Sequence, residues 1–198
     1  MSFLSIPIGQ KYGYKSYVKD GETVEIKSGG ADIWGKRDEF MFYCTETAGD
    51  FTAIVRLESF EMSDLYAKAG IMARETPDDK SPHVILAAFP NNSKRNKNNG
   101  GYEFQYREKA GMNSFAIYPS DYVAEPPMYP VNYPDVWLKL ERKGDTFICY
   151  CGSNGSDWRL YSSYDLALSK NLYVGLAVTA HSKDAMTVAK FSNVVIKQ

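Results

Sequence analysis

The stretch Tyr173-Val-Gly-Leu-Ala-Val-Thr179 indicates the fold class of this chain. It is short, contains no proline or charged residue, and is rich in the aromatic and β-branched residues that strands favour. Stretches of the same kind recur along the chain at 23–27, 51–57, 102–107, 137–141, 147–150 and 187–191. Many short strands with turns between them predict an all-β fold, which we expect to be a sandwich of two antiparallel sheets.

The turns between these stretches agree with that prediction. Arg142-Lys-Gly-Asp145 and Ser153-Asn-Gly-Ser156 each separate two strand signals and carry the residues of tight hairpin turns. The segment from Tyr161 to Lys170 has no convincing helical stripe, and we interpret it as a connection between strands.

Two stretches do not fit a strand interpretation. Asn91 to Gly101 is rich in asparagine and basic residues, which is typical of a solvated loop; a nuclear-import signal is the weaker alternative. Tyr118 to Pro134 interleaves prolines with tyrosines, and proline is excluded from central strands. Loops of this length are uncommon in compact domains and are often functional. Its tyrosines predict an ordered segment.

Composition limits the classes of function. The chain has 198 residues, of which 44% are hydrophobic and 24% charged, and its formal net charge is −1. These values suit a single globular domain over residues 1–198, and they offer no surplus of positive charge for nucleic acid or an anionic membrane. No apolar run is long enough to span a bilayer.

The first residues and the cysteines both predict a cytoplasmic protein. No basic residue precedes the first apolar residues, and Pro7 and Gly9 interrupt them before a signal-peptide core could form. The three cysteines, Cys44, Cys149 and Cys151, are an odd number in a chain too large to need disulfides. We therefore expect reduced thiols.

The alternation of side chains along strands predicts a polar face. In Ala67 to Arg74, Arg74 lies on the side opposite the alanines, and in Tyr102 to Arg107 the residues Gln105 and Arg107 lie opposite the aromatic residues. If the polar rows of Trp137 to Glu141 and Tyr173 to His181 line the same sheet, the resulting face suits a sugar. The alternative is an ordinary solvated sheet face.

The sequence lacks the pattern expected of a glycosidase. Glycosidases need two carboxylates at a separation of roughly 5 to 9.5 Å, and on one strand that requires residues spaced by two. The same-face neighbour of Glu103 is Gln105, and Glu58 and Glu61 fall on opposite faces. We therefore expect no catalytic residues.

The sequence also predicts neither a metal nor a cofactor. His83 and His181 have no second ligand at metal-binding spacing. Asp32 and Asp38 could contribute to a calcium site, but no dense acidic loop accompanies them.

A set of local motifs resembles a known family. The motifs are Gly29-Gly-Ala-Asp-Ile-Trp-Gly35, Gly49-Asp50, Ala67-Lys-Ala-Gly-Ile-Met-Ala-Arg74, Ser81-Pro-His83, Phe104-Gln-Tyr-Arg107, Trp137-Leu-Lys-Leu-Glu-Arg142 and Tyr173-Val-Gly-Leu-Ala-Val-Thr-Ala-His181. Together they resemble the concanavalin A-like jelly-roll module that is appended to many bacterial secreted enzymes and also occurs alone. The resemblance covers about residues 29 to 194 and implies a jelly-roll sandwich.

Among the stand-alone members, this chain is most similar to those named for regulation of enolase. That resemblance implies a non-catalytic role in carbohydrate metabolism, with enolase as the partner. The chain departs from the appended modules at Tyr118 to Pro134, where a short Gly/Ser-rich link is usual, so a surface has been added there.

These interpretations lead to one hypothesis about the site. A protein-contact surface combines the polar row with the tyrosines of the added segment, because Tyr and Arg are the residue types that most often contribute interface binding energy. The predicted contact residues are Arg74, Gln105, Arg107, Tyr122, Tyr129 and Tyr133. Two alternatives remain: a carbohydrate-binding module that uses the polar face, and tyrosines that merely cover the sheet.

Overall fold

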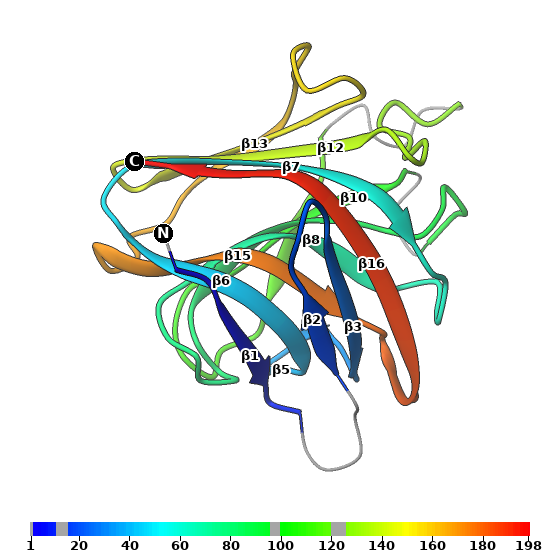
Figure 1. Cartoon of the computed structure of the whole chain (residues 1–198). Coiled ribbons are helices and arrows are strands. Elements are labelled where there is room, and N and C mark those ends of the chain that lie inside the picture. The colour runs from blue at the N-terminus through cyan, green and yellow to red at the C-terminus, as the bar shows by residue number, and fades with distance from the viewer. Residues whose placement is uncertain (1, 11–15, 96–99, 120–125) are drawn as a thin grey trace.

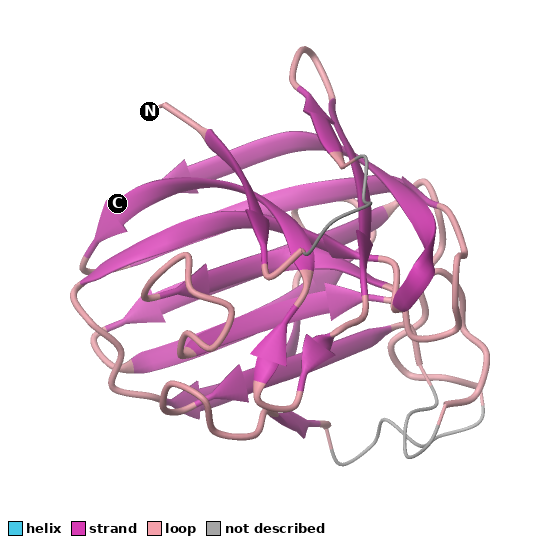
Figure 2. Cartoon of the chain, turned by 90° about the horizontal axis from the view of Figure 1, so that it is seen from below, coloured by secondary structure: helices cyan, strands magenta, loops and turns pink. Residues whose placement is uncertain are grey.

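The computed structural model describes residues 2–10, 16–95, 100–119 and 126–198. Over these residues the chain forms strands and connecting loops with no helix, as Figure 2 shows. The strands pair into two large antiparallel sheets that lie face to face as two layers (Figure 1). The predicted all-β jelly-roll sandwich is confirmed.

Each sheet has seven strands in the described residues. Sheet A has the order β1 (Leu4–Ile8), β6 (Phe40–Ala48), β15 (Asn171–Thr179), β8 (Lys68–Arg74), β9 (His83–Ala88), β10 (Tyr102–Arg107) and β11 (Phe115–Ile117). Sheet B has the order β14 (Arg159–Asp165), β13 (Thr146–Gly152), β12 (Val136–Lys143), β7 (Phe51–Phe60), β16 (Ser182–Lys197), β3 (Val24–Gly30) and β2 (Tyr17–Lys19). A separate hairpin pairs β4 (Ile33–Trp34) with β5 (Arg37–Asp38).

The main core fills the space between the two sheets. Alternate residues of each strand point inward, so that Ile71 and Leu176 of sheet A are buried in one apolar cluster with Val55 and Leu140 of sheet B. The three cysteines are free and buried. Burial of apolar surface at about 25 cal/mol per Å² is the main stabilising contribution of such a core.

A second apolar cluster lies on the other face of sheet A. It joins Phe42, Met72, Ile85 and Ala177 of the sheet to Ile33 of the β4–β5 hairpin. Strands β8 and β9 are therefore buried along their whole length on both faces. A strand buried on both faces reads as a continuous apolar run, which explains why β9 gave no period-two signal in the sequence.

The backbone at Gly30 allows the hairpin to fold against the sheet. Gly30 has a φ of +108°, which L side chains rarely adopt, and a Cβ there would lie 2.0 Å from the carbonyl oxygen of Glu39. The chain then turns through Ala31 and Asp32 into β4. The second glycine of the Gly29-Gly30 pair thus has a steric reason.

Two sequence interpretations need correction. The segment Tyr161 to Lys170 was expected to be a connection, but its first part belongs to β14, where Tyr161 is buried against the core. Asn91 to Gly101 was expected to be a solvated loop, yet Arg95 is buried and donates to the carbonyl oxygen of Leu65 at 2.6 Å. Both hairpin turns are confirmed by the β12–β13 and β13–β14 pairings.

Candidate functional site

A buried ion-pair cluster centred on Asp38 closes one end of the outer face of sheet A. Asp38 lies in the β4–β5 hairpin, and both of its carboxylate oxygens accept from Arg107, at 2.7 and 2.8 Å. Arg74 donates to the same carboxylate at 3.2 Å. The side chains of Asp38, Arg74 and Arg107 are all 0% exposed. Strand register sets this geometry, because His83 of β9 lies between Arg74 of β8 and Arg107 of β10.

Backbone carbonyl groups accept hydrogen bonds from other N–H groups of both arginines. Arg107 donates to Gly35 and Met112 at 3.0 Å each, and Arg74 donates to Thr76 at 2.8 Å. Burial lowers the pKa of His83 to about 4, so that this imidazole is neutral at physiological pH and adds no third positive charge. The cluster is thus a structural lock between the hairpin and the sheet.

The predicted polar row is not an open face. Arg74, Gln105 and Arg107 point to the outer side of sheet A, as alternation predicted, but all three are fully buried. The row of Trp137 and Lys139 lies on β12 of sheet B, so the polar rows do not line a single sheet. The physical reason is that the β4–β5 hairpin, far away in sequence, covers the face. Whether these residues take part in binding stays a prediction.

A second polar cluster lies at the other end of the same face. The ammonium group of Lys68, 3% exposed, pairs with Asp32 and lies 5.9 Å from the ring centroid of Trp34. The ring nitrogens of His181 lie 3.4 Å from Asp32 and 2.8 Å from Asp64. Trp34 is 41% exposed. This cluster combines an aromatic surface with hydrogen-bonding side chains, and the sequence analysis missed it because its members come from three separate segments.

Charge couplings set the protonation of this cluster. The Asp32 carboxylate raises the pKa of His181 above its ordinary value of 6.5 and outweighs the opposing effect of burial. Burial alone would raise the pKa of Asp32, but Lys68 and His181 hold it below its ordinary value. The carboxylate oxygens of Asp32 and Asp38 are thus taken by cationic side chains. Among the described residues, no three His, Cys, Asp or Glu side chains gather as a metal site requires.

The described part of the added segment runs along an edge of the sandwich. At its start, the hydroxyl of Tyr118 donates to Glu103 on the outer face of sheet A. Further on, the hydroxyl of Tyr133 donates to the carbonyl oxygen of Phe89 at 2.7 Å, and the ring of Tyr129 packs edge-on against Tyr161 at 5.0 Å. Tyr122 lies outside the described residues. Arg74, Gln105 and Arg107 therefore do not share an exposed surface with Tyr129, which is only 7% exposed.

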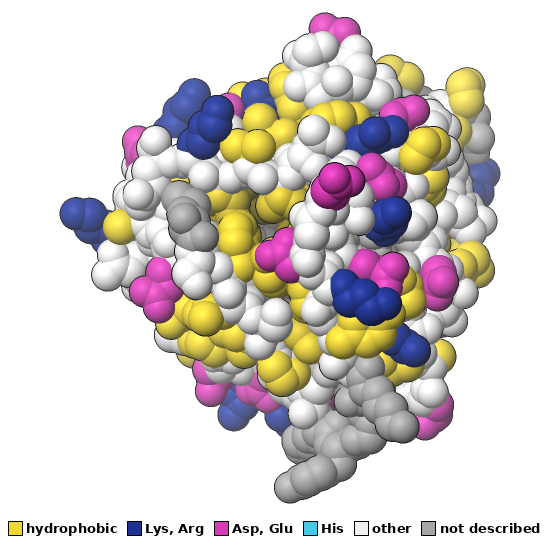
Figure 3. Space-filling model, viewed as in Figure 1, with side chains coloured by type: hydrophobic (Ala, Val, Ile, Leu, Met, Phe, Trp, Pro, Cys, Tyr) yellow, Lys and Arg dark blue, Asp and Glu magenta, His cyan; other side chains and the backbone are white. Residues whose placement is uncertain are grey.

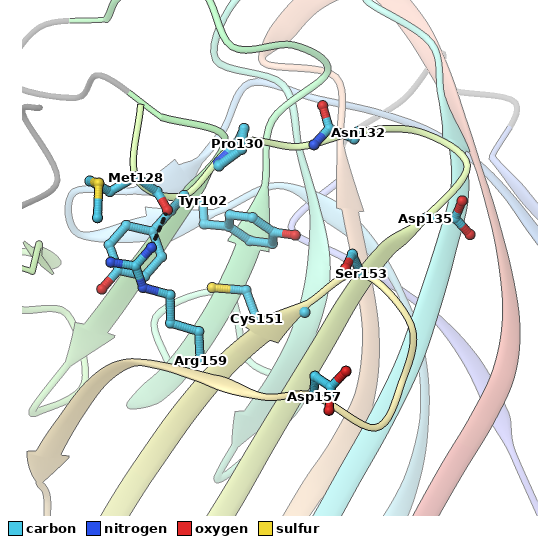
Figure 4. Close-up of a pocket in the computed structure, with 11 residues that line it drawn as sticks. Tyr102, Met128, Pro130, Asn132, Asp135, Cys151, Ser153, Asp157 and Arg159 are labelled. Atoms are coloured by element: carbon cyan, nitrogen blue, oxygen red, sulfur yellow. Dashed lines mark hydrogen bonds between the residues drawn. The ribbon is translucent and has the colours of Figure 1, made fainter. Parts of the chain in front are cut away.

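This segment forms one wall of a pocket of about 270 Å³ (Figure 4). The other wall is the β13–β14 turn. The residues that line the pocket are Tyr102, Met128, Tyr129, Pro130, Asn132, Asp135, Cys151, Gly152, Ser153, Asp157 and Arg159. Of the predicted contact residues that the structure describes, Tyr129 lines this pocket. The sequence pointed to the segment, but nothing in it indicated that the β13–β14 turn would face it.

The pocket contains a thiol and a guanidinium group. Its thiol, Cys151, is buried, and burial raises the pKa to about 12, so a nucleophilic thiolate does not form at neutral pH. Arg159 is held by a 2.7 Å hydrogen bond to the carbonyl oxygen of Met128, drawn dashed in Figure 4. Its guanidinium lies 4.3 Å from the ring centroid of Tyr129.

Residues 15–198 match a family of proteins of unknown function, DUF1349. The chain belongs to the DUF1349 family. None of the curated proteins matches it in sequence.

Solved structures share the fold of this DUF1349 protein at low sequence identity. A functionally unknown protein from Saccharomyces cerevisiae is 19% identical, with a TM-score of 0.69 over 99% of this chain and 95% of its own. The carbohydrate-binding module CBM66 from Bacillus subtilis is 18% identical, with a TM-score of 0.58 over the same shares. Alginate lyase AlgAT5 of polysaccharide lyase family 7 is 14% identical, with a TM-score of 0.52 over 98% of this chain and 93% of its own. These likenesses show a jelly-roll fold shared by binding modules and enzymes.

The described surface of this DUF1349 protein has no dominant charge on the face shown in Figure 3. Lys and Arg side chains are interspersed with Asp and Glu there, and neither sign forms a continuous patch. This agrees with the formal net charge of −1. No helix in the described residues could span a membrane.

The Asp38 cluster should be necessary for folding. We expect Asp38→Asn to lower the free energy of unfolding by about 3 to 5 kcal/mol, because it leaves two buried guanidinium groups without a counter-charge. Urea denaturation measures this loss. The matched control is Arg37→Ala in the same hairpin, which removes an exposed pair with Asp79 and should leave the midpoint close to that of the wild type. Equal midpoints for Asp38→Asn and the wild type would show that the lock contributes nothing.

His181 should make stability depend on pH. Because its folded pKa is raised, its contribution is complete below its unfolded value of 6.5 and is lost as the pH rises through the folded pKa. His181→Gln should therefore lower the urea midpoint more at pH 5.5 than at pH 8.5. His83 is the chain's other histidine, and its pKa of about 4 keeps it neutral over this range. A difference that is constant or grows with pH would contradict this pairing.

Proposed function

We propose that this protein is a non-catalytic binding module that regulates another protein in the cytoplasm through direct contact. The resemblance to stand-alone modules named for regulation of enolase makes enolase the proposed partner. The observation that carries the proposal is the pocket between the added segment and the β13–β14 turn, whose rim includes Met128, 38% exposed, and Arg159. Methionine and arginine are enriched in protein interfaces.

The absence of catalysis is part of this proposal. Glu103 is the carboxylate on the polar row of β10, and both of its oxygens accept hydrogen bonds, from Gln105 and from Tyr118. It is also only 7% exposed. A general acid or base must reach a substrate, but the Glu103 carboxylate is buried and accepts two hydrogen bonds. No second carboxylate lies on its strand face, and this supports a binding role.

Closure of the outer face of sheet A supports a protein ligand over an extended glycan. Arg74, Gln105 and Arg107 are covered, so a sugar chain has no open polar groove along these residues. An interface needs less concavity than a glycan site does, because rigid aromatic and methionine side chains can contribute binding energy at a shallow surface.

Enolase capture tests this proposal. Immobilised wild-type protein should retain purified enolase, and Met128→Asp should weaken binding by at least tenfold, because it places a charge in an apolar contact. The matched control is Met112→Asp: Met112 is 46% exposed and lies near Arg107, at the opposite end of β10 from the pocket. If the wild type does not retain enolase, enolase is the wrong partner. If Met128→Asp binds as well as Met112→Asp, the pocket is the wrong surface.

A carbohydrate ligand is the second candidate, and Trp34 favours it. This exposed ring lies beside the Lys68–Asp32–His181 cluster, and a pyranose can pack on such a ring while its hydroxyls bond to charged groups.

Calorimetric titration with a panel of mono- and oligosaccharides tests this second candidate. The carbohydrate candidate predicts saturable binding that falls at least tenfold in Trp34→Ala and persists in Trp158→Ala, a partly exposed tryptophan on the other sheet. Binding that is absent, or that both variants retain, would remove a sugar site at Trp34.

A further inference from the structure

Two aromatic rings and a thiol form the floor of the pocket. Tyr102, Tyr129 and Cys151 are 3%, 7% and 4% exposed, and they form the base between the two walls, as Figure 4 shows for Tyr102 and Cys151. The free volume of about 270 Å³ lies below the roughly 300 to 1,000 Å³ of sites that enclose whole small molecules. The pocket therefore suits a single large side chain.

Three of the polar side chains that line the pocket have hydrogen-bond partners. The guanidinium of Arg159 donates to the carbonyl oxygen of Met128. The hydroxyl of Tyr129 donates to the carbonyl oxygen of Leu160 at 3.3 Å. The carboxylate of Asp157 accepts from the amide of Asn154 at 2.7 Å. A sugar would have to displace these bonds to bind the three groups, whereas an apolar group leaves them intact. The contacts favour an apolar occupant.

The rim of the pocket is electrically polarised. In Figure 4, Arg159 lies at the same end as Met128, whereas Asp135 and Asp157 lie at the opposite end. Asp135 pairs with Arg56 at 2.8 Å, but the partner of Asp157 is an uncharged amide. Asp157 is also exposed. The acidic end therefore has an uncompensated carboxylate that can attract a positive charge.

We propose that this pocket binds a large apolar side chain of a partner protein, and that this side chain stands next to a lysine or arginine of the same partner. The apolar side chain enters between Met128 and Cys151, and the adjacent basic group faces Asp157. Methionine adapts to different side-chain shapes, so the lip formed by Met128 accommodates either an aliphatic or an aromatic group. This inference rests on the proposed function as a protein-binding module, and it names the chemistry that the module recognises.

Short capped peptides test the inference without any partner protein. One series places Leu, Phe or Ala at the anchor position beside Lys, and a second replaces that Lys by Gln or Glu. Binding is measured by NMR titration of the full-length ¹⁵N-labelled protein, through shifts of the Cys151 and Gly152 amide signals. We expect the Leu and Phe peptides to bind about tenfold more tightly than the Ala peptide, since a large apolar side chain is buried.

The basic flank gives a second and independent readout. Replacing Lys by Gln should weaken binding roughly threefold, and added salt should reduce this preference because the pair is exposed. In Asp157→Asn the preference for Lys should disappear while the preference for Leu over Ala remains. The matched control is Asp184→Asn, an exposed aspartate of β16 that does not line the pocket, which should behave as the wild type does.

The outcomes separate this inference from the proposed function. No saturable shift with any peptide, or equal binding of the Leu and Ala peptides, would overturn the inference even if enolase is captured. Peptide binding with the expected preferences, without capture of enolase, would support the pocket chemistry and remove enolase as the partner. Displacement of the Leu peptide by a sugar would show that the pocket takes a different class of ligand.

Discussion

The buried carboxylate of Asp38 is the constraint on which the rest of this structure depends. Asp38 belongs to the β4–β5 hairpin, and it pairs with Arg74 of β8 and Arg107 of β10 in sheet A. Removing such a charge from water is costly, and the cost is offset only when every partner is in place. The hairpin, β8, β9 and β10 are therefore fixed relative to one another, and the outer apolar cluster can form beneath the hairpin.

This lock determines where a ligand can bind. A jelly roll with one uncovered sheet would offer a broad polar surface, but here the β4–β5 hairpin occupies that position and the polar row becomes part of the interior. The Trp34 end of this face stays accessible, and so does the edge of the sandwich where the segment around Met128 meets the β13–β14 turn. The proposed protein contact uses the accessible edge of the sandwich because the polar row is covered. The candidate carbohydrate site lies at Trp34.

The pocket shows how an added segment builds a new surface on a common fold. Pro130 and its neighbours lie in a stretch that cannot enter a strand, so it runs along the edge and is held there by Tyr129 and Tyr133. Its backbone also pairs with the sheet at Gly101, which donates to the carbonyl oxygen of Tyr129 at 2.9 Å. The tyrosines thus serve chiefly as anchors, and the accessible contacts are Met128 and Arg159 beside them.

The sequence by itself determined the all-β class, the hairpin turns, the face of each strand on which Arg74, Gln105 and Arg107 lie, and the proline-rich segment that stays out of the central strands. These properties follow from local periodicity and turn chemistry, which act over a few residues. Only the tertiary structure decided that the polar row is buried, that Asp38 is its counter-charge, and that the β13–β14 turn completes a pocket with Met128. Each of these depends on contacts between residues far apart in the chain, and local patterns of side chains do not specify what covers a face.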